Sequence, residues 1–218
     1  MPGFADAVVR MPAAGADAVR LPWIVALHSS ADRPEWMCRH LDPIARPGPG
    51  LPHGAVLLCP AGLPRGDAAP TDPRWTWPGD AETAAEVRAA IAALRARYGA
   101  RLLGPPLLFG FSLGASRAAR LATAAPAEFP ALLLWEGGAP QLRGRPLRRY
   151  LAGGGVVRVG CSEVRCEAQA RGVCAGTTDA RCATFALPDI GHRVEPPFGS
   201  AIREVLLTLL PTGSESPR

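Results

Sequence analysis

The sequence predicts an α/β fold, in which a mostly parallel sheet is covered by helices on both faces. Two observations lead to this prediction. Short, continuous apolar runs recur along the chain, and segments with helical periodicity or helix-stop signals separate them. This alternation is typical of parallel strands joined by crossover helices. At 218 residues the chain is long enough for one such domain, but not for two.

The predicted strands are apolar runs bounded by polar residues, proline or glycine. Such runs are typical of strands buried on both faces of a sheet. In chain order they are Trp23–Leu27, 55–59, the apolar end of 102–109, 130–135, 156–160 and 182–187. Because the carboxyl ends of parallel strands meet at one edge, we expect the functional residues along that edge.

The segments between these runs predict helices. In chain order they are 35–45, 81–98, 115–122, 162–171 and 199–210, with a shorter helix around 146–151. The helix 81–98 has the clearest signals, because Asp80 can cap its start and Gly99 can stop it. Its apolar residues Val87, Ile91 and Leu94 lie three or four positions apart, on one face.

Both ends of the chain extend beyond a single domain that we assign to 21–212. Residues 1–20 contain two similar short stretches, 5–10 and 16–20, which predict a hairpin-like strand pair. The polar residues 213–218 predict a disordered tail.

Composition and charge describe an ordinary globular protein. Hydrophobic residues make up 48% of the chain and charged residues 20%. All 24 basic residues are arginine, which with abundant alanine, glycine and proline is typical of a GC-rich bacterial coding sequence. The densest arginine group, within 143–149, has no interleaved aromatic platform, so we expect no nucleic-acid partner.

The sequence also bears on location. No apolar run approaches the roughly 20 residues that span a bilayer, so we expect no membrane span. The first 20 residues include Asp6 and Asp17 and lack the apolar run of a signal peptide. These observations predict a cytoplasmic protein, and they leave its oligomeric state open.

The six cysteines show no metal-binding spacing. They are Cys38, Cys59, Cys161, Cys166, Cys174 and Cys182. None forms a C-x-x-C pair, so a zinc site is not expected. The last four lie within 22 residues and could form one or two disulfides. Without a recognisable secretion signal, we favour reduced thiols.

The most informative motif is Gly110-Phe111-Ser112-Leu113-Gly114, a G-x-S-x-G pattern between a buried strand and an alanine-rich helical run. In that setting the serine lies on a sharp, strained turn, and the flanking glycines let the helix pass close to the strand. The serine oxygen is then exposed at the start of a helix, where negative charge is favoured. Ser112 is therefore the candidate nucleophile.

A serine nucleophile needs a base, and the base needs an orienting acid. His192 is the candidate base, because it lies in the loop between the last strand and the last helix. Glu163, three residues beyond the strand 156–160, is the preferred acid, since it gives the order serine, acid, histidine. Glu136 after the preceding strand is the alternative, and Asp189 lies too near His192 in the same loop.

The remaining histidines predict no catalytic role. His28 ends the first buried strand and is interpreted as shaping the loop after it, while His40 and His53 are interpreted as structural or exposed. That loop has a second expected task. One backbone N–H of an oxyanion hole should come from Leu113, and the other from Ser30 or Ser29.

On these residues the chain resembles the α/β-hydrolase superfamily over roughly 21–212. It is most similar to the small, lidless branch of carboxylesterases, acyl thioesterases and dienelactone-hydrolase-like enzymes. The matching motifs are Leu27-His28-Ser29-Ser30-Ala31-Asp32, the G-x-S-x-G pentapeptide, Gly160-Cys161-Ser162-Glu163 and Gly191-His192. Two positions depart from the pattern: Ser29 stands where the family has glycine, and Glu163 where it has aspartate.

The resemblance implies a serine hydrolase that cleaves a carboxylic ester or thioester, a small molecule, through an acyl-enzyme. No metal or organic cofactor is expected. The alternatives are a catalytically inactive hydrolase-fold binding protein and an acyltransferase with the same triad. Only the 20 residues 136–155 separate two strands where larger relatives insert a cap, so an open groove is expected. In the loop 60–79, Trp75 and Trp77 either form a wall of that groove or pack beneath the loop.

Overall fold

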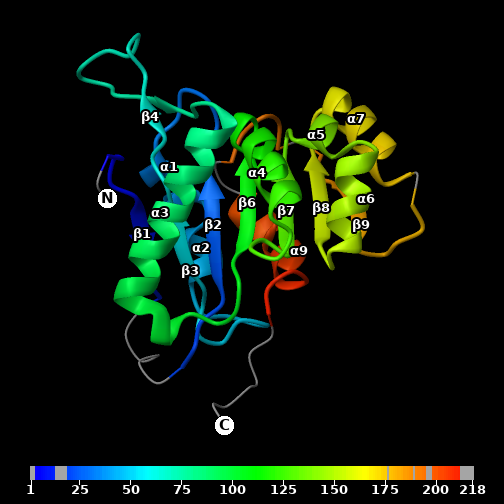
Figure 1. Ribbon diagram of the computed structural model, residues 1–218, viewed down its shortest axis with the longest axis horizontal. Helices are drawn as coiled ribbons and strands as arrows, with labels where there is room; N and C mark the ends of the chain where they lie inside the picture. Colours follow the sequence, from blue (N-terminus) through cyan, green and yellow to red (C-terminus); the bar gives the residue numbers. More distant parts are fainter. Residues whose placement is uncertain (1–2, 13–18, 176, 189, 195–197, 212–218) are drawn as a thin grey trace.

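The computed structural model describes residues 3–12, 19–175, 177–188, 190–194 and 198–211. Its centre is a seven-stranded sheet with the order β1-β3-β2-β6-β7-β8-β9 (Figure 1). The strands are β1 (Val8–Arg10), β2 (Trp23–Leu27), β3 (Val56–Cys59), β6 (Leu107–Phe111), β7 (Ala131–Trp135), β8 (Val156–Cys161) and β9 (Cys182–Ala186). All neighbours pair in parallel except β1, which is antiparallel to β3. The predicted parallel sheet is confirmed.

Helices cover both faces of this sheet. They are α1 (Pro34–His40), α2 (Asp42–Ala45), α3 (Asp80–Tyr98), α4 (Leu113–Ala124), α5 (Ala139–Leu142), α6 (Arg145–Ala152), α7 (Val164–Cys174), α8 (Phe198–Ala201) and α9 (Arg203–Leu207), with a 3₁₀ turn at Gly99–Arg101. Buried residues of α3 to α7 belong to one core cluster, and those of α1, α2, α8 and α9 to a second. Figure 1 shows α3, α4 and α6 in front of the sheet.

Strand β2 shows how the sequence builds both cores. Its five residues are fully buried, and their side chains alternate between the two faces. Trp23, Val25 and Leu27 join the core under α3 and α4. Ile24 and Ala26 join the core under α1 and α2. Burial of each large side chain contributes about 1.5–3 kcal/mol, which explains why a central strand is apolar throughout.

Two predicted helices are each divided in the structure. The predicted helix 35–45 forms α1 and α2, with Leu41 between them, because Pro43 lies in the first turn of α2 and favours a new helix start. The predicted helix 199–210 forms α8 and α9, which meet at Ile202. Between β7 and β8 the chain forms only α5 and α6, so no cap domain is inserted there.

The ends of the chain fit the expectations only in part. The stretch 5–10 contains β1, and the recorded partner of β1 is β3 rather than the stretch 16–20. Most of that second stretch, up to residue 18, lies outside the described residues, as does the predicted tail 213–218.

The loop 60–79 forms a two-stranded arm, β4 (Leu63–Pro64) with β5 (Trp75–Thr76), which Figure 1 shows projecting beyond the carboxyl ends of the sheet strands. The arm is tied to the loop after β2, because Asp32 and Trp75 exchange two backbone hydrogen bonds of 2.8 and 3.3 Å. Trp77 is buried at 4% exposure, whereas Trp75 is half-buried. Trp77 therefore packs beneath the loop.

The expectation of reduced cysteines is wrong, because the structure has three disulfides and no free cysteine. Cys38–Cys59 joins α1 to β3, Cys161–Cys166 joins the end of β8 to α7, and Cys174–Cys182 joins the end of α7 to β9. The Cα–Cα separations of 5.5–6.0 Å are usual for a disulfide. The expectation of reduced thiols rested on the lack of a recognisable secretion signal, which says nothing about which cysteines the fold brings together. The two ends of α7 lie beside β8 and β9, so their cysteines meet.

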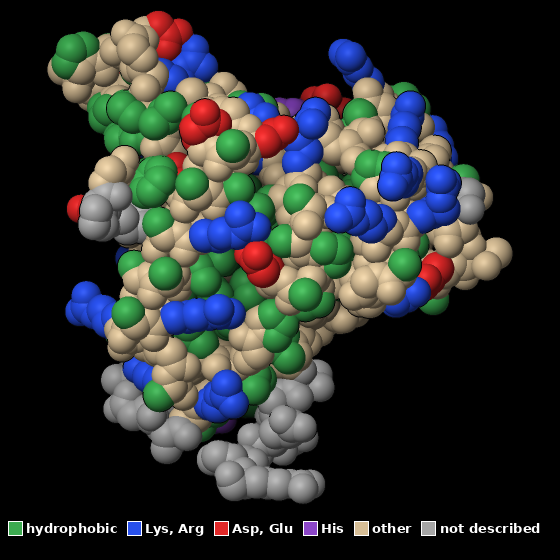
Figure 2. All heavy atoms as spheres, viewed as in Figure 1, with side chains coloured by type: hydrophobic (Ala, Val, Ile, Leu, Met, Phe, Trp, Pro, Cys, Tyr) green, Lys and Arg blue, Asp and Glu red, His purple; other side chains and the backbone are tan. Residues whose placement is uncertain are grey.

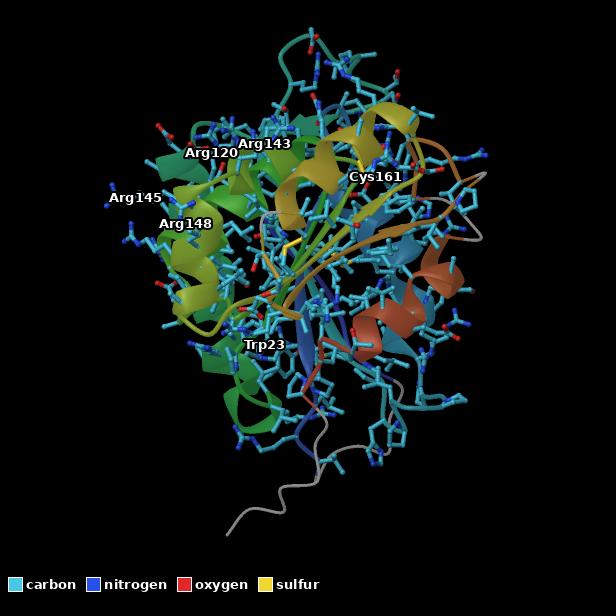
Figure 3. The ribbon with its side chains drawn as sticks, turned by 90° about the vertical axis from the view of Figure 1, so that its right-hand side faces the viewer. Trp23, Arg120, Arg143, Arg145, Arg148 and Cys161 are labelled. Atoms are coloured by element: carbon cyan, nitrogen blue, oxygen red, sulfur yellow. A yellow bond between two sulfur atoms is a disulfide. The ribbon has the colours of Figure 1, made fainter. Side chains whose placement is uncertain are left out.

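The basic residues spread over the surface of the helices, as Figure 2 shows for one face. Several are paired: Arg88 with Glu128, and both Arg117 and Arg120 with Asp80. The arginines of α6 point to solvent, as Figure 3 shows for the labelled Arg145 and Arg148. Among the described residues, no helix is both long and apolar enough to cross a membrane.

Candidate active site

Ser112 lies directly after β6 and immediately before α4, at the carboxyl edge of the sheet. Its backbone has a φ of 54°, a conformation that is costly for a residue with a Cβ and that clusters at functional sites. The two glycines of the motif allow this turn. A Cβ on Gly110 would lie 2.6 Å from Ala115 Cα, and one on Gly114 would lie 2.3 Å from Leu27 O. The helix therefore passes as close to the strands as the motif predicts.

His192 meets Ser112 across the carboxyl edge. Its Nε2 lies 2.9 Å from Ser112 Oγ, although the two residues are 80 positions apart. The imidazole packs against Phe111, with ring centroids 5.1 Å apart. The loop that carries it is fixed by Trp135, whose indole Nε1 donates to the carbonyl of Arg193 at 2.9 Å. The predicted nucleophile and base are thus brought within hydrogen-bond distance.

The carboxylate beside the other nitrogen of His192 belongs to Glu136. Glu136 Oε2 lies 3.6 Å from His192 Nδ1, and the Glu136 side chain is only 1% exposed. Sheet register explains the approach. Phe111 of β6 pairs with Trp135 of β7, so Glu136 follows β7 opposite Ser112. Glu136 also has a positive φ, of 51°, at the turn where β7 ends.

The second oxygen of Glu136 is held by the backbone. Glu136 Oε1 accepts hydrogen bonds from the N–H groups of Ser162 and of Glu163, the latter at 3.0 Å. Hydrogen bonds to an ionised carboxylate are stronger than those between neutral groups. The buried carboxylate is thereby oriented with one oxygen on the turn after β8 and the other toward His192.

Glu163, the preferred acid in the sequence analysis, does not make the contact with His192 Nδ1. It is the N-cap residue of α7, its side chain is exposed, and among the described residues its carboxylate has no hydrogen bond or ion pair. The physical reason is the sheet order. Strand β8 is separated from β6 by β7, so a residue after β8 starts one strand further from Ser112 than Glu136 does. Asp189, the other acid considered, lies outside the described residues.

Three side chains of this edge could also be read as metal ligands. Glu136, Glu163 and His192 each offer one atom, and the three atoms lie within 4.8 Å of one another. A histidine that lies between two carboxylates gives the same short distances without any metal ion. Since Glu136 already accepts two backbone hydrogen bonds and His192 contacts Ser112, the contacts present fit proton transfer better than metal coordination.

The sequence predicts the backbone donors of an oxyanion hole at Leu113 and at Ser30 or Ser29. Leu113 is the first residue of α4, and Ser29 and Ser30 lie in the turn after β2. Across the described part of the chain, the N–H groups of Leu113, Ser29 and Ser30 have no backbone acceptor. The close approach of Gly114 to the carbonyls of Leu27 and His28 brings the two segments together.

His28 supports the turn after β2 from below. It is fully buried, and its ring nitrogens lie 2.7 Å from the carbonyl oxygens of Ser29 and Ala61. Trp77 packs against the ring at a tilt of 34°, with centroids 4.7 Å apart, and donates its indole N–H to the carbonyl of His28 at 2.6 Å. These contacts agree with the interpretation that His28 shapes the loop.

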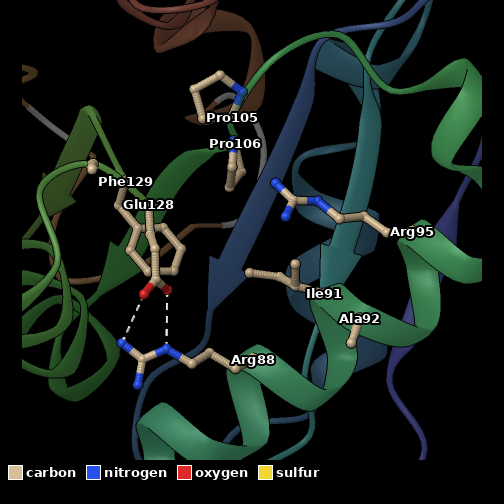
Figure 4. Close-up of a pocket in the computed structure, with 9 residues that line it drawn as sticks. Arg88, Ile91, Ala92, Arg95, Pro105, Pro106, Glu128 and Phe129 are labelled. Carbon is tan, nitrogen blue, oxygen red and sulfur yellow. Dashed lines mark hydrogen bonds and ion pairs between the residues drawn. The ribbon is translucent and has the colours of Figure 1, made fainter.

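A surface hollow on the same chain has none of this chemistry. It measures about 470 Å³, and Figure 4 shows it between α3 and the segments before β6 and β7. An ion pair of Arg88 with Glu128 crosses it, and Ile91, Pro106 and Phe129 form its apolar wall. It lies at the amino ends of the strands, opposite to Ser112, and no serine, cysteine or histidine lines it.

Comparisons with known proteins identify the fold. No protein-family model and no curated protein sequence matches the chain. Among solved structures it is similar to a ferulic acid esterase, with a TM-score of 0.68, 14% identity, and coverage of 93% of this chain and 91% of that one. It is also similar to the Bacillus cereus carboxylesterase, with a TM-score of 0.58, 14% identity, and coverage of 91% of this chain and 92% of that one. A third similar structure is the Paleococcus ferrophilus monoacylglycerol lipase, with a TM-score of 0.58, 10% identity, and coverage of 93% of this chain and 96% of that one. The chain has the α/β-hydrolase fold.

Proposed function

We propose that the protein is a serine hydrolase that cleaves a carboxylic ester or thioester through an acyl-enzyme intermediate. The observation that carries the proposal is the 2.9 Å contact of His192 Nε2 with Ser112 Oγ, with Glu136 behind the imidazole. A serine hydroxyl is a weak nucleophile by itself, and this contact gives it a base within hydrogen-bond reach.

Ser112 and His192 carry out the proton transfers, and Glu136 supports His192. As Ser112 Oγ attacks the substrate carbonyl carbon, its proton passes to His192 Nε2, and the buried Glu136 carboxylate stabilises the imidazolium. The imidazolium then gives that proton to the leaving alcohol or thiol, and the acyl group stays on Ser112. A water molecule, deprotonated by His192, attacks the acyl carbonyl, and the imidazolium returns that proton to Ser112 Oγ as the acid leaves.

The negative oxygen of each tetrahedral intermediate needs fixed donors. We assign them to the backbone N–H groups of Leu113 and Ser30, with Ser29 as the alternative to Ser30. Two such donors supply a large share of the rate enhancement in acyl transfer, because they are oriented before the reaction begins. Among the described residues, the N–H groups of Leu113, Ser30 and Ser29 have no backbone acceptor, which supports donor roles for this set. The family resemblance favours Ser30 over Ser29.

The substrate class draws support from the similar structures. The ferulic acid esterase, the carboxylesterase and the monoacylglycerol lipase are each named for hydrolysis of an ester. A thioester remains in the proposal, because its carbonyl reacts with the same nucleophile. The cytoplasmic location remains a prediction, against which the three disulfides weigh, since disulfides are rare in reducing compartments.

A fluorophosphonate probe tests the proposal directly, because it labels only a serine that a base has activated. We expect one equivalent of label on the wild-type protein, located on Ser112 by peptide mass spectrometry. The Ser112→Ala variant should take up none. A folded wild-type protein that stays unlabelled would support the inactive binding protein instead.

A substrate panel then defines the reaction. It consists of p-nitrophenyl esters of increasing acyl length, one thioester and one peptide. We expect hydrolysis of esters or the thioester and none of the peptide. Addition of a small alcohol distinguishes a hydrolase from an acyltransferase. A transferase would move the acyl group to the alcohol and form a new ester in preference to the free acid.

A further inference from the structure

The turn after β8 touches both partners of the proposed nucleophile. It consists of Ser162 and Glu163, which follow Cys161 at the end of β8, and the backbone N–H groups of both hold Oε1 of Glu136. These two bonds fix one oxygen of the acid. They leave the other oxygen, Oε2, facing His192 Nδ1 at 3.6 Å.

The same turn also holds the loop that carries His192. The N–H of Gly191, the residue before His192, donates to Ser162 Oγ at 2.7 Å. Further back along the chain, the N–H of Leu187 donates to the carbonyl of Cys161 at 2.9 Å. The loop between β9 and α8 is thus attached to the end of β8 at its start and to this turn beside the histidine.

Ser162 is the residue of the turn that links Glu136 to the loop of His192, with its main chain on Glu136 and its side chain on the loop. Its N–H binds Glu136, and its hydroxyl accepts from the neighbour of His192. It is half-buried, which limits competition from water for that hydroxyl. Gly191 has a φ of 73°, so the loop turns sharply at the point where Ser162 holds it.

We propose that Ser162 is a positioning residue that sets the distance between the acid and the base of the site. This inference rests on the proposed function. Proton transfer from Ser112 requires the imidazole to stay within a few tenths of an ångström of its productive position, and small misplacements reduce rates steeply. The hydroxyl of Ser162 supplies that restraint without being one of the reacting groups.

Two variants of Ser162 test the proposal. Ser162→Ala keeps the N–H for Glu136 and removes only the acceptor for Gly191, whereas Ser162→Thr keeps both. Ser200→Ala is the matched control, because Ser200 is exposed on α8. We measure kcat and KM on the best p-nitrophenyl ester, with the active fraction of each preparation titrated by the fluorophosphonate. Counting active sites in this way corrects for any misfolded protein.

The expected result is a kcat lower by on the order of 10- to 100-fold in Ser162→Ala, with KM within about twofold of wild type. Ser162→Thr should recover most of the kcat, and Ser200→Ala should match wild type. An unchanged kcat in Ser162→Ala, a change confined to KM, or a threonine variant as slow as alanine would each overturn the proposal. In all three cases an active wild-type enzyme leaves the proposed function standing. A wild-type protein that neither labels nor hydrolyses overturns both.

Discussion

Two residues of the site have an unusual positive φ. Ser112 and Glu136 have φ values of 54° and 51°, and they follow adjacent strands at matching positions in the register. A side chain in the left-handed region costs of order 1–3 kcal/mol and persists only where the surroundings enforce it. Here Gly137 helps, because a Cβ at that position would lie 2.6 Å from Ser112 O. The two turns pack backbone against backbone and turn both side chains toward the same edge.

The first prediction at the residue scale concerns the nucleophile and the base. Ser112→Ala and His192→Ala should each lower kcat by on the order of 10³-fold or more. The double variant should be little slower than either single variant, because the two side chains act as one unit in proton transfer. The measurement is kcat on one ester for the three variants. Multiplicative losses in the double variant would mean that the two residues do not work together.

The second residue-scale prediction separates the two candidate acids. Glu136→Gln should lower kcat by orders of magnitude with little change in unfolding temperature, because an amide can no longer stabilise the imidazolium. Glu163→Gln should change kcat by less than about threefold, since the Glu163 carboxylate is exposed and has no partner among the described residues. Steady-state kinetics of both variants check this. If Glu163→Gln lowered kcat more than Glu136→Gln does, Glu163 would be the acid instead.

Chain order alone could not choose between these acids. Both Glu136 and Glu163 lie between Ser112 and His192 in the sequence, so both satisfy the order serine, acid, histidine. The choice depends on which strand lies beside β6, and that is a property of the sheet order. Glu136 could be recognised from the sequence only by assuming that consecutive strands β6 and β7 are neighbours. The bridging hydroxyl of Ser162 gives no sequence signal, because its partner is a backbone N–H.

At the scale of elements, the apolar runs were sufficient to predict the central strands, since burial on both faces leaves few other choices of residue. Helix α3 was predicted from an Asp80 cap, a Gly99 stop and an apolar face, but neither end forms as predicted. Asp80 is the first helical residue after the N-cap Gly79, and Gly99 stays in the helical region of φ and begins the 3₁₀ turn. The apolar pattern also missed Glu86, which is 1% exposed. Glu86 Oε1 accepts the N–H of Gly62 at 2.7 Å, at the start of the loop that supports the turn after β2. Helical periodicity cannot reveal a charged residue within an apolar face when the group that binds it lies in a loop distant in the sequence.

The prediction for this element is a pH-dependent stability. Burial raises the pKa of the Glu86 carboxyl, and hydrogen bonds from Gly62 and Ala61 offset only part of that effect. A carboxyl whose pKa is raised on folding stabilises the protein below its unfolded pKa, and this stabilisation is lost as pH rises through the folded pKa. Glu86→Gln keeps an acceptor for Gly62 without the charge. The variant should therefore melt above wild type at pH 8, with the difference closing toward pH 4.

Thermal unfolding of both proteins between pH 4 and pH 8 measures this effect. In a domain of this size, 1 kcal/mol shifts the midpoint by about 2–4 °C. Glu82→Gln, on the exposed side of the same helix, is the control and should follow wild type at every pH. The contrary result is a Glu86→Gln midpoint that, relative to wild type, is lower at pH 8 than at pH 4. It would show that the ionised Glu86 carboxylate stabilises the folded protein.

At the scale of the whole molecule, the disulfides brace the scaffold on both sides of the site. Cys38–Cys59 ties α1 to β3 in one core, and the other two bridges tie α7 to β8 and β9. Of these two, Cys161–Cys166 borders the turn after β8, which holds Glu136 and the loop of His192. None of the six sulfurs contacts Ser112 or His192, so the bridges contribute to stability rather than to the reaction.

The prediction for the whole molecule is that all six cysteines are oxidised in the active protein. Denatured without reductant, the protein should expose no thiol to a maleimide, and after reduction it should take up six labels. The bridge Cys38–Cys59 closes the longest loop, of 21 positions, and in the chain-entropy model such a loop contributes about 3 kcal/mol. Reduction should therefore lower the unfolding midpoint by at least about 6 °C. Six labels without reductant would rule out all three bridges.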